Sequence, residues 1–143
     1  MEVLQLSVFL ENAAGRLADV AEVLAASAIN VRALALADMA EFGILRLVVD
    51  DTERARQALK GAGFTVNTTA VVAVGVPDAP GGMAKVLRAL GRRGLAVEYM
   101  YAFARRRGEE AILIFRVEDR VSALIALQEQ ALHVLDGPEV HGA

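Results

Sequence analysis

The sequence contains no cysteine and no tryptophan, and it has only three prolines and two histidines. Without cysteine the chain has no disulfide framework, no thiolate nucleophile and no cysteine-ligated zinc site. Aromatic residues make up 5% of a chain that is 55% hydrophobic, so its apolar content is mostly Ala, Val and Leu. Disordered chains are poor in aliphatic residues and rich in charge. This composition therefore predicts a folded protein.

Neither sign of charge dominates, because 15 basic residues oppose 18 acidic ones and the net charge is −3. We therefore expect no general attraction to nucleic acid or to anionic lipid. The longest run without a charge, residues 61–77, is 17 residues long. A membrane-spanning helix needs about 20, so no membrane partner is expected. The first residues lack the basic region of a signal peptide, and we expect a cytoplasmic protein.

Residues that carry catalysis are also scarce. The histidines, His133 and His141, stand near the end of the sequence, where we expect them to be exposed on a fraying tail. No serine lies in a GxSxG turn. The run Gly61-Ala62-Gly63 follows a predicted helix, so it is a helix stop and not a nucleotide-binding loop. We predict that the protein is not an enzyme and has no cofactor and no metal site.

An internal repeat organises the chain. An offset of 66 places Gly15 on Gly81 and Leu24 on Leu90. After an insertion near residues 105–108 the offset becomes 68, which places residues 44–51 over residues 112–119. We interpret the chain as a tandem duplication, with one domain over residues 1–70 and a second over residues 71–143.

Each repeat shows the hydrophobic periodicities of strand, helix, strand, strand, helix, strand. The first repeat gives strands at 5–10, 29–37 and 44–49, a fourth from Phe64, a helix through Leu17 and Leu24, and a helix capped by Asp50 that ends near Gly61. The second gives strands at 72–76, 96–104, 111–117 and near His133, with helices at 82–92 and 120–130. The predicted fold is α+β: two tandem ferredoxin-like βαββαβ domains with antiparallel sheets packed side by side.

RNA-recognition modules share this order of elements, but they stack bases on exposed aromatic residues of the sheet. Here the central strands are predicted to offer mainly Leu and Val. The basic run Arg105-Arg106-Arg107 falls at a predicted hairpin tip, where we interpret it as a solvated turn. We expect no nucleic-acid partner.

Two equivalent turns, residues 11–17 and 77–83, remain as candidate sites. Each places a short polar side chain, Asn12 or Asp78, three residues before a glycine between a strand and a helix. Free N–H groups at the start of a helix suit a carboxylate, and Asn12 or Asp78 can accept from an ammonium group. This chemistry fits a zwitterionic amino acid. The alternative is that both side chains only cap helices, and spacing alone leaves both open.

The string Phe9-Leu10-Glu11-Asn12-Ala13-Ala14-Gly15-Arg16-Leu17-Ala18, with Ala28-Ile29-Asn30-Val31 after it, resembles the start of an ACT domain. The second repeat, with residues 80–84 and 94–103, is also ACT-like. Over residues 3–140 the chain resembles the small stand-alone tandem ACT proteins, which have no catalytic domain.

This resemblance implies a regulatory module that binds an amino acid between one domain's first turn and the second strand of its neighbour. Carried over to this sequence, the ligand-binding positions are Asn12, Ala14, Gly15, Arg16, Leu17, Asn30 and Val31 in the first repeat. In the second repeat they are Asp78, Pro80, Gly81, Gly82, Met83, Val97 and Tyr99. The sequence departs from the family pattern at Ala14, where proline is common, and at Ala28 and Ala96.

Tyr99 and Tyr101 lie two positions apart and therefore on the same face of one predicted strand. There they either form the floor of a pocket or pack on a helix. The function predicted from the sequence is a non-catalytic protein that reversibly binds a free amino acid or similar ligand, as a homodimer. The main alternative is a regulatory subunit that holds an amino-acid biosynthetic enzyme. A third is an enzyme with its active site between the domains.

Overall fold

The computed structural model describes residues 2–38, 40–104 and 110–142, so the Arg105–Arg107 run lies outside the described residues. The chain forms two compact units. The N-terminal unit contains Leu4–Thr69 together with the residues from His141 onward, and the C-terminal unit contains Ala70–Val140 together with the residues up to Val3. Each unit therefore includes a short segment from the opposite end of the sequence.

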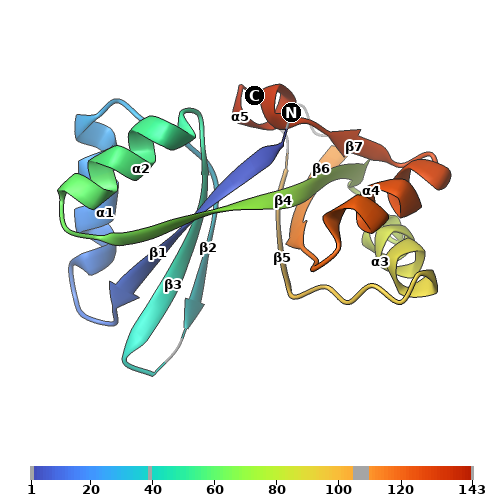
Figure 1. Ribbon diagram of the computed structural model, residues 1–143, viewed down its shortest axis with the longest axis horizontal. Helices are drawn as coiled ribbons and strands as arrows, with labels where there is room; N and C mark the ends of the chain where they lie inside the picture. The colour runs from blue at the N-terminus through green and yellow to red at the C-terminus, as the bar shows by residue number, and fades with distance from the viewer. Residues whose placement is uncertain (1, 39, 105–109, 143) are drawn as a thin grey trace. The chain divides into compact units, whose positions relative to one another are not determined.

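The N-terminal unit has the βαββαβ order that the sequence predicts. Its elements are β1 (Val3–Glu11), α1 (Arg16–Ala26), β2 (Val31–Asp38), β3 (Phe42–Val49), α2 (Thr52–Gly61) and the first part of β4 (Thr65–Pro77). The strand order is β2-β3-β1-β4, and β3 runs antiparallel to both of its neighbours. Both helices lie on the same face of this sheet (Figure 1).

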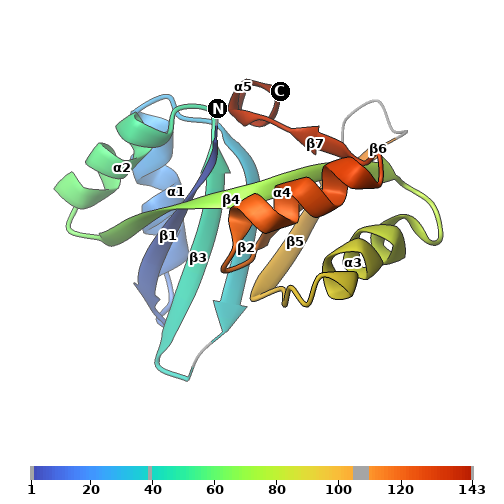
Figure 2. The same ribbon diagram turned by 45° about the vertical axis from the view of Figure 1, so that its right-hand side comes forward.

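The C-terminal unit repeats this plan. It contains the end of β4, α3 (Gly82–Arg92), β5 (Tyr99–Ala104), β6 (Glu110–Arg116), α4 (Arg120–Glu129), β7 (His133–Leu135) and α5 (Gly137–His141). Its strand order is β7-β4-β6-β5, with antiparallel pairing throughout. Helices α3 and α4 lie on the same side of β5 and β6 (Figure 2). The predicted pair of ferredoxin-like domains is confirmed.

Alternation along the strands builds each core, because every second side chain of a strand points to the same face. In the N-terminal unit the helix-facing residues of β1 and β3 meet the apolar stripes of α1 and α2, and all are buried: Leu6, Val8, Leu10, Val20, Leu24, Leu45, Leu47, Ala55 and Leu59. The C-terminal core is built in the same way, from Val72, Val74, Val76, Val86, Leu90, Leu113, Phe115, Ala123 and Leu127.

The ends of the helices repeat as closely as the cores. After α1, the N–H of Ile29 donates to the Leu24 carbonyl at 2.9 Å, and after α3 the N–H of Leu95 donates to the Leu90 carbonyl at 3.1 Å. The residue before each donor has a positive φ, 55° at Ala28 and 70° at Gly94. The two repeats thus end their first helices in the same way, one with alanine and one with glycine.

Two local predictions are wrong. The cap of α2 is Asp51, which accepts from the N–H of Arg54 at 3.2 Å, and not Asp50. The Asp50 carboxylate instead accepts from the N–H of Asn30 at 3.0 Å, where the chain enters β2. The strand predicted at 96–104 begins only at Tyr99, although the N–H of Glu98 already donates to the Arg116 carbonyl at 2.9 Å.

The predicted strands from Phe64 and at 72–76 form one continuous strand, β4, which contributes to both units. Helix α5 was not predicted. In the part of the chain that the structure describes, no helix is long and apolar enough to cross a membrane.

Candidate functional site

The two strand-to-helix turns have the same backbone hydrogen bonds. In the first turn, the N–H of Ala13 donates to the Glu11 carbonyl at 2.8 Å, and the N–H of Arg16 donates to the Ala13 carbonyl at 3.3 Å. The same bonds recur 66 positions later, from the N–H groups of Ala79 and Gly82, at 2.8 and 3.2 Å. The internal repeat therefore extends to the conformation of these turns.

A glycine with positive φ caps each following helix. Gly15 has φ 86° and ψ −13°, and Gly81 has φ 92° and ψ −12°, a region that favours glycine. Neither cap includes a side-chain hydrogen bond, so the interpretation of Asn12 and Asp78 as helix caps is wrong. The N–H groups at the start of each helix bond to no described residue. These groups belong to Leu17, Ala18, Met83 and Ala84.

Asn12 connects its turn to the hairpin between β2 and β3. Its backbone N–H donates to the Glu41 carbonyl at 2.9 Å, and its side-chain Nδ2 donates to the Ala40 carbonyl at 3.4 Å. These bonds use donors only, so the side-chain Oδ1 is the acceptor that Asn12 offers at the turn. The equivalent residue, Asp78, is exposed.

Arg16 makes its contacts within the N-terminal unit. Its guanidinium lies 4.6 Å from the centre of the Phe64 ring, and Nη1 donates to Asp19 Oδ2 at 3.0 Å. The Asp19 carboxylate and the Phe64 ring both stabilise the positive charge of the Arg16 guanidinium. The side chain predicted to bind ligand thus already has two partners.

A cavity of about 340 Å³ opens beside the first turn. Its lining residues come from the end of β1, the turn, α1, β2 and β3: Leu10, Glu11, Asn12, Ala13, Leu17, Leu36, Ala37 and Gly43. Two predicted residues, Asn12 and Leu17, line this cavity, whereas Ala14, Gly15 and Arg16 do not. Sequence reasoning missed Leu36 and Gly43, since only the strand register places them beside the turn.

A cavity of about 490 Å³ lies beside the second turn. Its lining includes the predicted residues Pro80, Gly81 and Gly82, but Asp78 and Met83 do not contribute. The other lining residues are Gly75, Pro77, Lys85, Glu110, Ala131, Leu132 and His133. This cavity therefore carries charges of both signs.

His133 is held between two carboxylates at this second cavity. Its Nδ1 lies 3.1 Å from Glu110 Oε2, and its Nε2 lies 3.4 Å from Glu139 Oε2. The hydrogen bond to Glu110 raises the pKa of His133; burial opposes this, and Glu139 adds to it. A Cβ atom at Gly75 would lie 2.4 Å from Glu110 Oε1, so the glycine makes room for this carboxylate.

His141 is also not on a fraying tail. Its Nε2 accepts from the N–H of Leu4 at 3.1 Å, and its Nδ1 donates to the Val49 carbonyl at 2.6 Å. The His141 carbonyl accepts from Nε of Arg32 at 3.2 Å. The sequence near its end gives no signal of these contacts, because their partners lie between 92 and 137 positions away along the chain.

The predicted residues of the first repeat's second strand lie away from the turn within their own unit. Val31 pairs with Val49, whereas the cavity residue Gly43 pairs with Asp38 at the other end of β2. Val31 also packs against the N-terminal core, and the backbone of Asn30 is bonded to Asp50. Neither Asn30 nor Val31 lines the cavity at the first turn.

The second repeat shows a similar separation. Val97 packs against the C-terminal core, as does Met100. Because side chains alternate along a strand, Tyr99 and Tyr101 lie on the face of β5 opposite to Met100. They therefore point away from α3 and α4, and both interpretations of these two side chains stay predictions.

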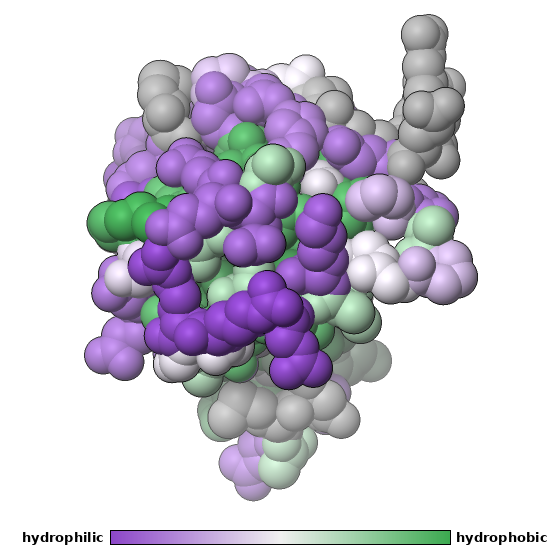
Figure 3. All heavy atoms as spheres, turned by 90° about the vertical axis from the view of Figure 1, so that its right-hand side faces the viewer, coloured by the Kyte–Doolittle hydropathy of each residue, from purple (hydrophilic) through white to green (hydrophobic). Residues whose placement is uncertain are grey.

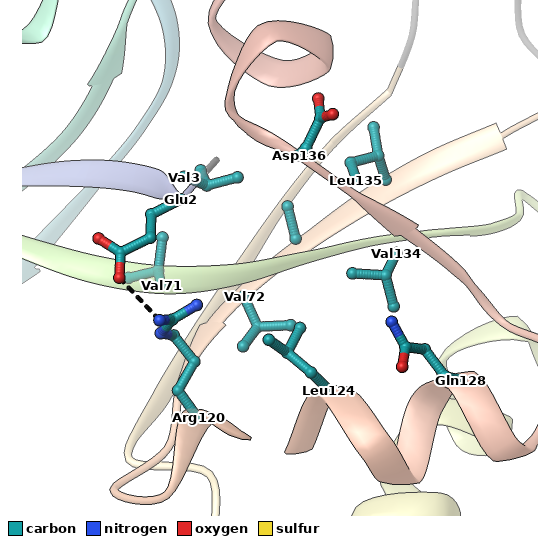
Figure 4. A pocket seen from close by; sticks show the side chains of 11 residues that line it. Glu2, Val3, Val71, Val72, Arg120, Leu124, Gln128, Val134, Leu135 and Asp136 are labelled. Carbon is teal, nitrogen blue, oxygen red and sulfur yellow. Dashed lines mark hydrogen bonds and ion pairs between the residues drawn. The ribbon is translucent and has the colours of Figure 1, made fainter. Parts of the chain in front are cut away.

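A further cavity of about 380 Å³ lies between α4, β4 and β7. Figure 4 shows Glu2 and Arg120 facing one another beside it, with Oε1 and Nη2 2.7 Å apart. These charges neutralise each other, so they do not mark this cavity as a site for a charged ligand. The surface on the side of α3 and α4 is largely hydrophilic (Figure 3). Among the described residues, no cluster of His, Asp or Glu side chains could hold a metal ion.

Comparison with known proteins agrees with this geometry. Residues 1–139 match the family described as the ACT domain pair. The crystal structure of protein BT0572 from Bacteroides thetaiotaomicron has 41% sequence identity and a TM-score of 0.93, covering 100% of this chain and 98% of that one.

The regulatory subunit of aspartate kinase from Thermus thermophilus has the same fold at 21% identity and a TM-score of 0.65, covering 90% of this chain and 93% of that subunit. The corresponding subunit from Thermus flavus has 19% identity and a TM-score of 0.62, covering 90% and 92%. No curated protein matches the sequence. The repeat, the two βαββαβ units and the match over residues 1–139 show that the chain belongs to the ACT domain pair family.

Proposed function

We propose that the protein is a regulatory protein without catalytic activity, and that it binds a free amino acid or a similar small zwitterion at its strand-to-helix turns. The observation that carries this proposal is the pair of glycine-capped helix starts at Gly15 and Gly81. Because no side chain caps either helix, the first N–H groups are available to a ligand carboxylate. Asn12 and Asp78 supply nearby acceptors for an ammonium group.

The fold supports a role in regulation. Structures with the same fold include regulatory subunits of aspartate kinase. In such a role, a ligand acts by stabilising the conformation to which it binds more tightly. We further propose a homodimer, since Leu34 and Leu36 on the edge strand β2 are 58% and 53% exposed. Analytical ultracentrifugation gives the oligomeric state with and without ligand.

A thermal-shift screen of the free amino acids tests the binding proposal. A ligand that binds only the folded state, at about 100 times its Kd, stabilises that state by about 2.7 kcal/mol. We expect at least one amino acid to raise the Tm, and Asn12→Ala or Asp78→Ala to reduce that rise without preventing folding. If no amino acid changes the Tm and both variants change only the stability, the binding proposal fails.

The second candidate is a regulatory subunit whose main role is to hold a biosynthetic enzyme. The exposed leucines of β2 favour it, because exposed apolar clusters often mark protein interfaces. Gel filtration with the aspartate kinase of the same source tests this idea directly. Co-elution that is lost in Leu34→Ser supports it, and separate elution at micromolar concentrations contradicts it.

A further inference from the structure

At the first turn, the row of core side chains along β3 ends in a glycine that lines the cavity. Along β3, Leu47 and Leu45 face the helices, and Gly43 is the next residue on the same face. Gly43 pairs with Leu10 of β1, so a side chain at position 43 would point between the sheet and α1. A Cβ there would lie 3.5 Å from Leu36 Cδ1 and 3.3 Å from the Ala37 carbonyl oxygen. A larger residue at position 43 would therefore press on Leu36 and Ala37, which line the cavity.

Three leucines form the walls of this space. Leu10 is buried, whereas Leu17 and Leu36 are 46% and 53% exposed although both line the cavity. Removing apolar surface from water is favourable. A ligand that covers the exposed parts of Leu17 and Leu36 is therefore stabilised in this cavity. The cavity volume of about 340 Å³ is near the lower end of the range for small-molecule sites.

Polar groups border this apolar space. Asn12 lines the cavity, and its Oδ1 accepts no hydrogen bond from a described residue. Glu11 also lines the cavity, but it follows Leu10 on β1, so its side chain lies on the opposite face of the sheet. The Asn12 oxygen is therefore the acceptor available to the amino group of a ligand whose side chain enters between the leucines.

The second turn lacks this apolar space. Leu36 pairs with Leu45, and the equivalent pair in the C-terminal unit is Ala102 with Leu113. The position of Gly43 is taken by Ala111, which packs against the core. The cavity beside the second turn is instead lined by Lys85 of α3, Glu110 of β6 and His133 of β7. The two turns have the same backbone conformation, but the cavity beside the first is lined mainly by apolar side chains, whereas the lining of the second includes charges of both signs.

From this contrast we infer that the first turn binds an amino acid with a larger aliphatic side chain, such as leucine, isoleucine, valine or methionine. Its side chain occupies the cavity between Leu10, Leu17 and Leu36, and its ammonium group faces Asn12 Oδ1. This inference rests on the proposed function and adds to it a ligand class and a choice between the two turns.

Isothermal titration calorimetry on the full chain tests the ligand class. We expect leucine, isoleucine, valine or methionine to bind at least about tenfold more tightly than alanine, aspartate or lysine, because each methylene in an apolar pocket changes affinity about tenfold or more. Removing either charge of leucine, as in 4-methylpentanoate and 3-methylbutylamine, should weaken binding by at least about tenfold as well.

An exposed apolar residue of α4 provides the control for a cavity variant. Leu36→Ala removes a cavity wall and should weaken leucine binding about tenfold, while Val121→Ala, which is 62% exposed and lines neither turn cavity, should leave it unchanged. Gly43→Ala should weaken the binding of leucine more than that of valine, since the added methyl narrows the cavity. Thermal melts of each variant separate loss of binding from loss of folding.

The outcomes distinguish this inference from the proposed function. If no amino acid binds, the proposed function itself fails. If an acidic or basic amino acid binds best, or if Lys85→Ala abolishes binding and Leu36→Ala does not, the protein is still an amino-acid sensor but this inference is wrong. Equal loss of leucine binding in Val121→Ala and Leu36→Ala also overturns it.

Discussion

At the scale of single residues, two alanines adopt a backbone conformation that is costly for them. Ala28 and Ala131 both have φ 55°, whereas the equivalent residues of the other repeat, Gly94 and Gly63, are glycines. The left-handed conformation costs a residue with a Cβ atom about 1–2 kcal/mol. Glycine avoids this cost but loses more entropy on folding. We therefore expect Ala28→Gly to raise the free energy of unfolding by about 0.5–1 kcal/mol in urea titrations.

A second alanine in the same region serves as the control. Ala21 is exposed in the middle of α1, and glycine in the interior of a helix costs about 1 kcal/mol relative to alanine. Ala21→Gly should therefore destabilise the protein while Ala28→Gly stabilises it. If both substitutions lower stability equally, backbone strain at Ala28 does not contribute.

His133 gives the protein a pH-dependent interaction. Glu110, and to a lesser extent Glu139, raises its pKa in the folded state above the ordinary value of 6.5. The stabilisation is therefore complete below about pH 6.5 and is lost as the pH rises through the folded-state pKa. We expect His133→Gln to lower the free energy of unfolding more at about pH 5.5 than at about pH 9.

The size of this effect should be modest, because the His133 side chain is 47% exposed and water screens exposed ion pairs. An NMR titration of the His133 ring gives the folded-state pKa, and Glu110→Gln should lower it. A difference between wild type and His133→Gln that is the same at both pH values contradicts the prediction.

At the scale of the elements, the sequence predicts best what depends on periodicity. Helix α3 begins and ends where its pattern of Val86, Leu90 and neighbouring glycines places it, since one face of the helix is apolar along its whole length. The cap of α2 was misplaced by one residue because Asp50 and Asp51 are equally good caps in sequence. Only the approach of Asn30 to Asp50 decides between them.

The candidate site could be predicted only in part, because some of its residues come together only through strand pairing. The turns themselves could be found, because glycine spacing within one segment determines them. The cavity at the first turn also needs Leu36 and Gly43, which reach it through the pairing of β2 with β3 and of β3 with β1. Pairing of this kind connects residues that are distant in sequence, and a single sequence does not reveal it.

At the scale of the whole molecule, the repeat in sequence and the units in space do not have the same limits. The N-terminal unit includes His141, whose ring accepts from the N–H of Leu4 and donates to the Val49 carbonyl. The same ring therefore contacts backbone groups of both β1 and β3. The first repeat therefore takes part of its hydrogen bonding from residues at the far end of the sequence.

We expect His141→Ala to lower the free energy of unfolding by about 1–2 kcal/mol, because it leaves two partly buried backbone groups without partners. Hydrogen exchange should increase at Leu4, whereas Gly142→Ser, at an exposed neighbouring residue, should change neither quantity. A fragment of residues 1–70 lacks His141 entirely, so its β1 and β3 should exchange faster than in the full chain. Equal protection of these strands in the fragment and the full chain would show that the first repeat folds independently of His141.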